Sequence, residues 1–342
     1  DQSIGIYVER RISVDFIKRY TTAEGLRLSI AVTTDTVEEA RVRHDLWPVA
    51  TAALGRTMTG AMLMAGDFKN DENVSIRLRG DGPLGIVHVD AFSNNTVRGY
   101  VDHPHVDVPL MREGKLDVGA AVGRNGEVQV TRFTKLRQNY TSQSPIQTGE
   151  VAEDLAYYLA MSEQVGSVLS LGVLVDPDYH TIVAGGFLVQ ALPDVTNDAF
   201  DKIEANLKTI GTVTNYLKAH PNAEQLMERI LDGFTVQEVY NERIHFACPC
   251  SRERFFDRLA SLPMHDKKEL AEDEHVIIAM KNIIFQKKIC KHYSLKTHIN
   301  EICFYGGNIM KCIEWNGSEV IILDQTKLPT SVEYVHCTDW RQ

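Results

Sequence analysis

The cysteines of this 342-residue chain are confined to its final third, and this distribution limits what the chain can build. The six thiols are Cys248, Cys250, Cys290, Cys303, Cys312 and Cys337. A secreted scaffold held by disulfides would spread its cysteines along the whole chain. A cytosolic chain that gathers them at one end is typical of a metal or redox module attached to a cysteine-free body.

Composition excludes several classes of protein. The chain carries 36 basic and 46 acidic side chains, a formal net charge of −10, which disfavours binding to nucleic acid. Hydrophobic residues make up 44% and charged residues 24%, which is enough apolar material for an ordinary core. No signal peptide and no run of about eighteen apolar residues is visible, so we expect a cytoplasmic protein without a membrane span.

The first part of the body combines strand and helix patterns. Apolar and β-branched residues predict a strand at 27–34. A helix is expected over 36–45, capped by Asp35 or Thr36. The segment 48–66 is rich in Ala, Leu and Met, which predicts a buried helix.

The rest of the body is richer in strands. Residues 74–101 show the alternation and turn residues of an antiparallel meander. Further elements are predicted as strands at 116–123 and 127–133, a helix at 150–164, and a strand pair at 169–175 and 181–192 around a turn at 176–180. Residues 15–193 are therefore expected to form one core domain of the α+β class.

The pattern changes after residue 193. Strand patterns disappear from 194–244, and short amphipathic helices are separated by Gly211, Pro221 and Gly233. Asn222 opens a variant of the capping box with Gln225 three residues on. The helix that follows carries three apolar residues on one face, Leu226, Ile230 and Phe234. Because such short helices are marginal alone, we expect this helical linker to be the least stable part of the chain.

One motif matches a nucleotide-binding pattern by its letters only. Residues 80–85, GDGPLG, fit G-x-G-x-x-G, but strand residues follow them, whereas a phosphate loop must open a helix. A tight turn is therefore favoured over a dinucleotide site. The P-loop motif G-x-x-x-x-G-K-[ST] does not occur, so nothing in the sequence indicates ATP-driven work.

Two histidine pairs are candidates for acid–base or metal chemistry. His44 stands beside Asp45, and His103 stands near His105. Neither pair has a nucleophile or a third ligand near it in the sequence. We favour turn or surface histidines in both cases.

The pair Cys248-Pro249-Cys250 is the sharpest chemical signal. Two thiolates this close can share a soft metal, and they can also be oxidised to a small-ring disulfide. A tetrahedral zinc site needs four ligands, usually with a second pair in C-x-x-C spacing, and the sequence has none. The remaining candidate ligands are Cys290, His292 and Cys303. A metal or redox site and two incidental thiols both stay open.

Seven sequence blocks, in order, resemble the 33 kDa chaperonin family, the redox-regulated holdase heat-shock proteins. The resemblance runs from about residue 15 to about residue 275. The blocks are HDLWPVA from His44, GDGPLG from Gly80, RGYV from Arg98, KLDVGAAVG from Lys115, PIQTGEVAEDLAYYLAMSEQ from Pro145, AGGFLVQ from Ala184 and CPCSRERF from Cys248.

The resemblance implies an ATP-independent chaperone of the stress response and not an enzyme. In that family a C-x-C and a C-x-x-C hold zinc, and oxidation forms disulfides, releases zinc and unfolds switch and linker. The exposed apolar surface then captures unfolded client proteins, and the active form is a homodimer. The implied layout is an N-terminal extension at 1–14, the core at 15–193, a metastable linker at 194–244, a partial redox-switch zinc domain at 245–279 and an atypical tail at 280–342.

The sequence departs from this family where the second cysteine pair should stand. From about Met310 the tail instead resembles the start of methylthioribose-1-phosphate isomerases, over about thirty residues that include none of the catalytic region. The leading hypothesis is a holdase with Cys248 and Cys250 as redox-active zinc ligands in an altered switch. The alternatives are an isomerase-type enzyme fragment or fusion and, disfavoured by the acidic charge, a zinc module that binds nucleic acid.

Overall fold

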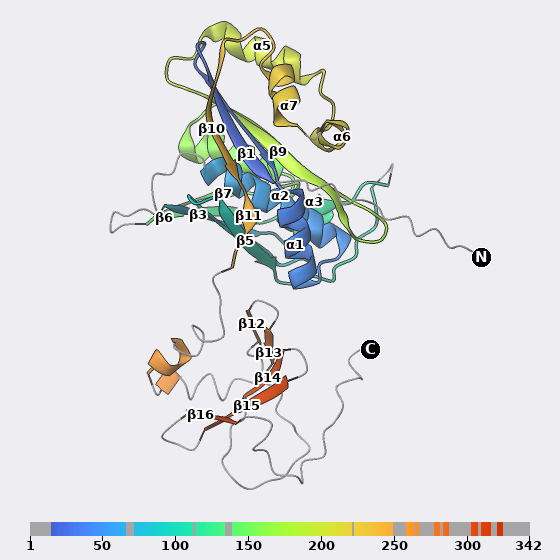
Figure 1. Cartoon of the computed structure of the whole chain (residues 1–342), viewed down its shortest axis with the longest axis vertical. Coiled ribbons are helices and arrows are strands. Elements are labelled where there is room, and N and C mark those ends of the chain that lie inside the picture. The colour runs from blue at the N-terminus through green and yellow to red at the C-terminus, as the bar shows by residue number, and fades with distance from the viewer. Residues whose placement is uncertain are drawn as a thin grey trace, which may run out of the picture. The chain divides into compact units, whose positions relative to one another are not determined.

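A computed structural model of the chain describes residues 15–65, 72–111, 114–133, 139–220, 222–248, 258–263 and 265–266, and the backbone of five strands between 277 and 323. The chain divides into two compact units, one ending at Ala247 and one beginning at Cys248. The first unit contains two β-sheets with a helix between them (Figure 1). This arrangement confirms the predicted α+β class.

The first sheet has five antiparallel strands in the order β10-β1-β2-β9-β8. Their bounds are β1 Phe16–Thr22, β2 Leu26–Val32, β8 Ser167–Val175, β9 Thr181–Ala191 and β10 Val236–Arg243. β2, β8 and β9 confirm the predicted strands. The turn predicted between β8 and β9 is closed by a bond of 2.9 Å from the backbone N of Asp176 to the backbone O of His180.

The expectation that strands end at residue 193 is wrong for β10. Its sequence, VQEVYNER, is mostly polar, and most of its side chains are exposed. β10 is a strand because it pairs antiparallel with β1 along its whole length, with Thr22 opposite Val236 and Phe16 opposite Arg243. Long-range pairing of this kind outweighs local propensity and leaves little trace in a sequence.

The second sheet has the order β11-β5-β4-β3-β6-β7. Its strands are β3 Asn73–Arg79, β4 Ile86–Phe92, β5 Thr96–Val101, β6 Glu127–Phe133, β7 Tyr140–Pro145 and β11 His245–Phe246. β3 to β5 confirm the predicted meander, and β6 confirms the strand at 127–133. β11 lies parallel to β5, and the other neighbours are antiparallel.

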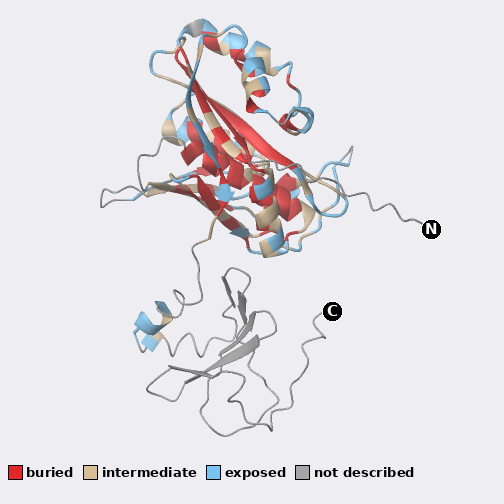
Figure 2. Ribbon diagram, viewed as in Figure 1, coloured by how far each residue is buried: buried red, intermediate tan, exposed pale blue. Residues whose placement is uncertain are grey.

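The helix α2, Pro48–Met64, packs against strands of both sheets and confirms the predicted buried helix. All its residues from Val49 to Met64 except Arg56 are buried (Figure 2). Small residues permit this close packing: a Cβ on Gly60 would lie 2.6 Å from Cδ1 of Leu155. The core of the first unit is therefore a helix enclosed by two sheets.

The helix α1, Thr34–His44, forms where a helix is predicted, but its cap is not Asp35 or Thr36. The carboxylate of Asp15 accepts hydrogen bonds from the backbone N of Asp35 at 3.1 Å and of Thr36 at 2.6 Å. A carboxylate suits this position because it satisfies N–H groups at the positive end of the helix. The cap comes from the residue before β1, which a local search for capping residues cannot find.

Replacing Asp15 with asparagine should remove a pH dependence from the free energy of unfolding. Burial raises the pKa of Asp15 to about 6, although hydrogen bonds from Thr36 and Asp35 oppose the shift. The folded state therefore binds this proton more tightly than the unfolded chain, and the resulting stability is lost as the pH rises towards 6. Between about pH 5 and about pH 8 the wild type should lose about 1.4 kcal/mol more than the variant. Urea unfolding of the wild type and of the variant at both pH values measures how much the free energy of unfolding changes. The same change in both proteins would contradict this prediction.

The strand predicted at 116–123 is wrong, because this segment forms the short helix α3, Val118–Val122. The side chain of Asp117 accepts a bond of 2.8 Å from the backbone N of Ala120, and Gly123 ends the helix with a φ of 90°. α3 lies against the turn at 80–85, where a Cβ on Gly80 would come within 2.0 Å of the carbonyl O of Val122. The cap and the small residues favour the helical turn over a strand.

The helix predicted at 150–164 is present as α4, Ala152–Tyr158, followed by a π-helical turn, η3, Leu159–Glu163.

Three helices occupy the segment predicted as a helical linker. They are α5 Asn197–Leu207, α6 Val213–Ala219 and α7 Ala223–Ile230. Among the helices of the described residues, none is long and apolar enough to cross a membrane.

The second unit contains one antiparallel sheet in which the strands follow their order in the chain. Its strands are β12 Ile277–Met280, β13 Ile283–Gln286, β14 Ile302–Gly306, β15 Ile309–Trp315 and β16 Val320–Leu323. In the backbone register of β14 and β15, Cys303 stands opposite Cys312. The predicted extension at 1–14 lies outside the described residues.

Candidate functional site

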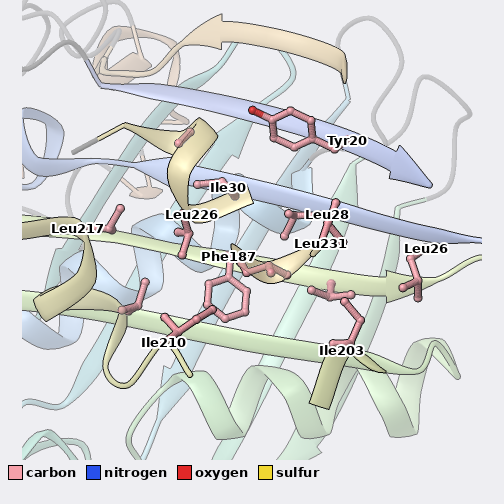
Figure 3. Close-up of a cluster of buried hydrophobic side chains, with 14 of the residues drawn as sticks. Tyr20, Leu26, Leu28, Ile30, Phe187, Ile203, Ile210, Leu217, Leu226 and Leu231 are labelled. Atoms are coloured by element: carbon pink, nitrogen blue, oxygen red, sulfur yellow. The ribbon is translucent and has the colours of Figure 1, made fainter. Parts of the chain in front are cut away.

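An extensive apolar layer separates the first sheet from the helices α5, α6 and α7. The sheet contributes side chains from β1, β2 and β9, and the helices contribute side chains from 199 to 231 (Figure 3). The buried members are Tyr20, Leu26, Leu28, Ile30, Val32, Val183, Phe187, Val189, Ala199, Ile203, Ile210, Val213, Leu217, Ala223, Leu226, Ile230 and Leu231. We call the sheet members of this layer the covered face, namely Tyr20, Leu26, Leu28, Ile30, Val32, Val183, Phe187 and Val189. Removing the three helices would expose most of it to water.

The helix α7 contributes the apolar side that the sequence predicts. Leu226 and Ile230 are fully buried, and Phe234 packs against the apolar layer from the turn after the helix. Asn222 caps the helix as expected, but its side chain accepts a bond of 3.0 Å from the backbone N of Glu224 and not from that of Gln225, the residue that the capping-box pattern indicated. Each amphipathic turn of α7 is thus held by its contact with the sheet.

The helical layer consists of short pieces. α5 has 11 residues, α6 has 7 and α7 has 8, lengths at which an isolated helix is marginal in water. Gly211, at a φ of 71°, lies between α5 and α6, and Gly233, at a φ of 76°, lies between α7 and β10. The stability of the layer therefore depends on packing against the covered face.

Polar contacts that the sequence did not predict also fasten this layer. Lys18 of β1 forms an ion pair with Glu224 of α7 and lies 3.8 Å from the carboxylate of Glu238 on β10. Asn206 of α5 donates to the backbone O of Ile230 at 2.9 Å. These pairs are far apart in sequence, and single charged or amide residues carry no local signal for them.

The chain leaves the first unit directly before the predicted thiol pair. The backbone N of Ala247 donates to the O of Val97 at 3.1 Å, and Cys248 follows as a partly exposed free thiol. Cys250, Cys290 and His292, and the side chain of Cys303, lie outside the described residues. Within the part of the chain whose side chains are described, no three His, Cys, Asp or Glu residues gather as a metal site.

The motif at 80–85 forms the tight turn that its context predicts. The turn leads into β4, and Gly85 has a φ of 69°. The backbone N of Gly82 donates to the O of Val122 at 3.0 Å, so α3 lies against this loop. The described structure therefore offers a structural reason for the glycines in place of a phosphate site.

The structure brings together residues from the two histidine pairs. His105 Nε2 lies 2.9 Å from the carboxylate of Asp45, and its ring lies 5.6 Å from that of Trp47, whereas His44 packs in a different place. The side chain of Asp45 is 87% exposed and that of His105 is 51% exposed. A water-exposed pair without a nearby nucleophile fits the predicted surface role.

Comparison with known proteins identifies the relatives of this chain. The family model described as Hsp33 protein matches residues 15–280. The 33 kDa chaperonin of Listeria innocua is 39% identical over 264 residues, covering 76% of this chain and 90% of the relative. That of Desulforamulus reducens is 40% identical over 261 residues, covering 76% and 88%. The crystal structure of the 33 kDa chaperonin from Thermotoga maritima superimposes with a TM-score of 0.70 at 33% identity, covering 79% of this chain and 92% of that one.

The family match, the named relatives and the structural neighbour place the chain among the redox-regulated molecular chaperones. The relatives are named as chaperonins. The chain belongs to the Hsp33 family. The family match ends at residue 280, so the tail resemblance to an isomerase concerns residues beyond it.

Proposed function

We propose that the covered face is the surface on which this chaperone holds unfolded client proteins. The observation that carries the proposal is the apolar layer itself, which is closed only by three short helices. When the helices leave, strand side chains such as Leu28, Ile30 and Phe187 lie open to apolar segments of a client. Burial of apolar surface then provides binding energy without directional contacts, which suits clients of many sequences.

The same surface accounts for work without ATP. Capture requires only that the helical layer opens and that a client binds in its place, so no nucleotide and no catalytic group takes part. We therefore propose that the chain is a holdase and not an enzyme. Its acidic net charge of −10 also supports protein clients over nucleic acid.

Family membership supports three further proposals. We propose a homodimer in the active state, a cytoplasmic location and a redox switch at Cys248 and Cys250. In the switch, peroxide would oxidise the two thiols to one disulfide and would itself be reduced to water, with the two thiol protons taken up in that water. Opening of the helical layer would follow this step.

The helices α5, α6 and α7 should exchange their amide hydrogens faster than the strand segment 183–190. Short helices that depend on tertiary packing open with free energies well below that of a central strand. Hydrogen exchange followed by mass spectrometry on the reduced full-length chain measures both segments at once. Equal protection of the helices and of β9 would contradict a layer that opens by itself.

We further propose that zinc is bound weakly or by a remodelled ligand set. A complete structural zinc site contributes roughly 10 to 16 kcal/mol near neutral pH, and this is also folding energy for its module. Cys248 and Cys250 supply two thiolates, and only Cys290, His292 and Cys303 are left as substitutes for the missing pair. No C-x-x-C spacing supports these substitutes.

Metal analysis of freshly purified, reduced protein should therefore find well under one zinc per chain. Because half a site contributes little folding energy, the switch should be poorly held in its inactive state, and some chaperone activity should appear without oxidant. One tightly held zinc per chain, released by peroxide together with a rise in activity, would show that the switch is intact.

A further inference from the structure

The last four residues of the first unit, 244–247, join its two sheets. The backbone N of Ile244 donates to the O of Asp15 at 3.0 Å, beside β1 of the first sheet. The backbone N of Ala247 donates to the O of Val97 at 3.1 Å, on β5 of the second sheet. We call residues 244–247 the clasp. The clasp continues the chain from β10 of the first sheet to a position beside β5 of the second sheet, and it ends directly before Cys248.

Phe246 anchors the clasp with its side chain. Its ring is 7% exposed although it belongs to a strand of two residues. The guanidinium carbon of Arg43 lies 5.2 Å from the ring centroid, and the ring of His44 meets it edge-on at 6.4 Å. Both contacts come from the last turn of α1. The aromatic ring therefore fastens the clasp to a helix of the core as well as to β5.

A second contact ties β10 to the opposite sheet just before the clasp. The side-chain N of Asn95 donates to the hydroxyl of Tyr240 at 2.8 Å, and that hydroxyl donates back to the Asn95 Oδ1 at 3.1 Å. Asn95 lies at the tip of the β4–β5 turn, and the guanidinium of Arg19 lies 4.2 Å from the Tyr240 ring. The middle of β10 is thus held at Tyr240 by groups from both sheets.

We propose that Phe246 is the positioning residue that couples the thiol segment to the helical layer. Cys248 lies two residues beyond Phe246, so the chain connects the thiol segment directly to the clasp. Release of Phe246 frees the end of β10, and β10 in turn follows α7 in the chain. The inference rests on the proposed function, because it describes how the covering layer is held closed.

The test compares three full-length variants by hydrogen exchange under reducing conditions, without any client. Phe246→Ala should speed exchange of the β10 amides by at least about tenfold, with β3 and β4 unchanged. Phe246→Leu, which keeps an apolar anchor, should restore most of the protection. Tyr240→Phe removes one hydroxyl and leaves the core intact, so it should accelerate β10 by a smaller factor even if Phe246→Ala fails to fold.

Phe133→Ala is the matched control, because it removes a partly buried phenylalanine from β6 of the second sheet. It should leave β10 exchange unchanged. Unchanged β10 exchange in Phe246→Ala, or an equal acceleration of β3 and β4, would overturn the coupling role. If Phe246→Ala does not fold, unchanged exchange of the β10 amides in Tyr240→Phe would overturn the coupling role. Neither result would affect the proposed client surface, which is tested by client binding and not by exchange at β10.

Discussion

Replacing Asp154 with alanine should lower the free energy of unfolding by about 4 kcal/mol, a large share of the roughly 5 to 15 kcal/mol typical of a domain. The Asp154 side chain is fully buried and accepts four backbone hydrogen bonds. The donors are the N atoms of Gln147 at 2.7 Å, Thr148 at 2.9 Å, Gly149 at 3.3 Å and Val151 at 2.9 Å. Alanine would leave these donors without that acceptor, at a cost of about 1 kcal/mol or more each.

The same carboxylate holds an unusual backbone conformation. Val151 has a φ of 71°, which a β-branched residue seldom adopts, and its N–H is one of the four donors. Without Asp154 the loop before α4 should relax. Glu153→Ala is the matched control, because Glu153 is the exposed acidic neighbour in the same helical turn. Urea unfolding of both variants decides the matter, and equal small losses would contradict this account of the loop.

Replacing Leu226 with alanine should activate the chaperone without oxidant. Leu226 is fully buried between α7 and the first sheet, and truncation of such a side chain costs about 2 to 5 kcal/mol. Since about 1.4 kcal/mol corresponds to a tenfold change in an equilibrium, the open form of the layer should become at least roughly 25 times more populated. Reduced protein should then suppress aggregation of a heat-denatured client more strongly than the wild type.

Glu228→Ala provides the control for this prediction. Glu228 lies on the exposed side of the same helix, so its removal leaves the covered face intact. Light scattering of the client measures all three proteins under the same reducing conditions. Reduced Leu226→Ala that is no more active than Glu228→Ala would show that the helical layer does not control access to the binding surface.

Much of the fold could be predicted from local patterns. The helix α2, rich in Ala, Leu and Met, the alternating strands β3 to β5 and the turn between β8 and β9 each have a composition, a period or a turn residue that is visible in a short window. The covering helices were also predictable, because Asn222 caps α7 and its apolar residues repeat at helical spacing.

The features that escaped prediction depend on partners far away in the sequence. β10 is polar and becomes a strand only beside β1, and α1 is capped by Asp15 from about twenty residues upstream. α3 was mistaken for a strand because its five residues are too few to show a helical period. No local pattern encodes these contacts.

The candidate site likewise contains residues that a local sequence pattern indicates and residues that it does not. The sequence drew attention to Cys248, whose role in a redox switch stays a prediction. The sequence indicated only the side chains of α7 that pack against the covered face, since the covered face itself consists of strand residues such as Leu28 and Phe187 that look like ordinary core. Their significance comes from the marginal helices that cover them.

We expect this chain to hold unfolding proteins on an apolar surface without ATP. The most direct test is light scattering of a heat-denatured client mixed with the full-length chain, with and without peroxide, in the absence of nucleotide. We expect the chain to suppress aggregation without ATP and to do so more strongly after oxidation. Suppression that requires ATP, or no suppression under any redox or thermal condition, would contradict the claim.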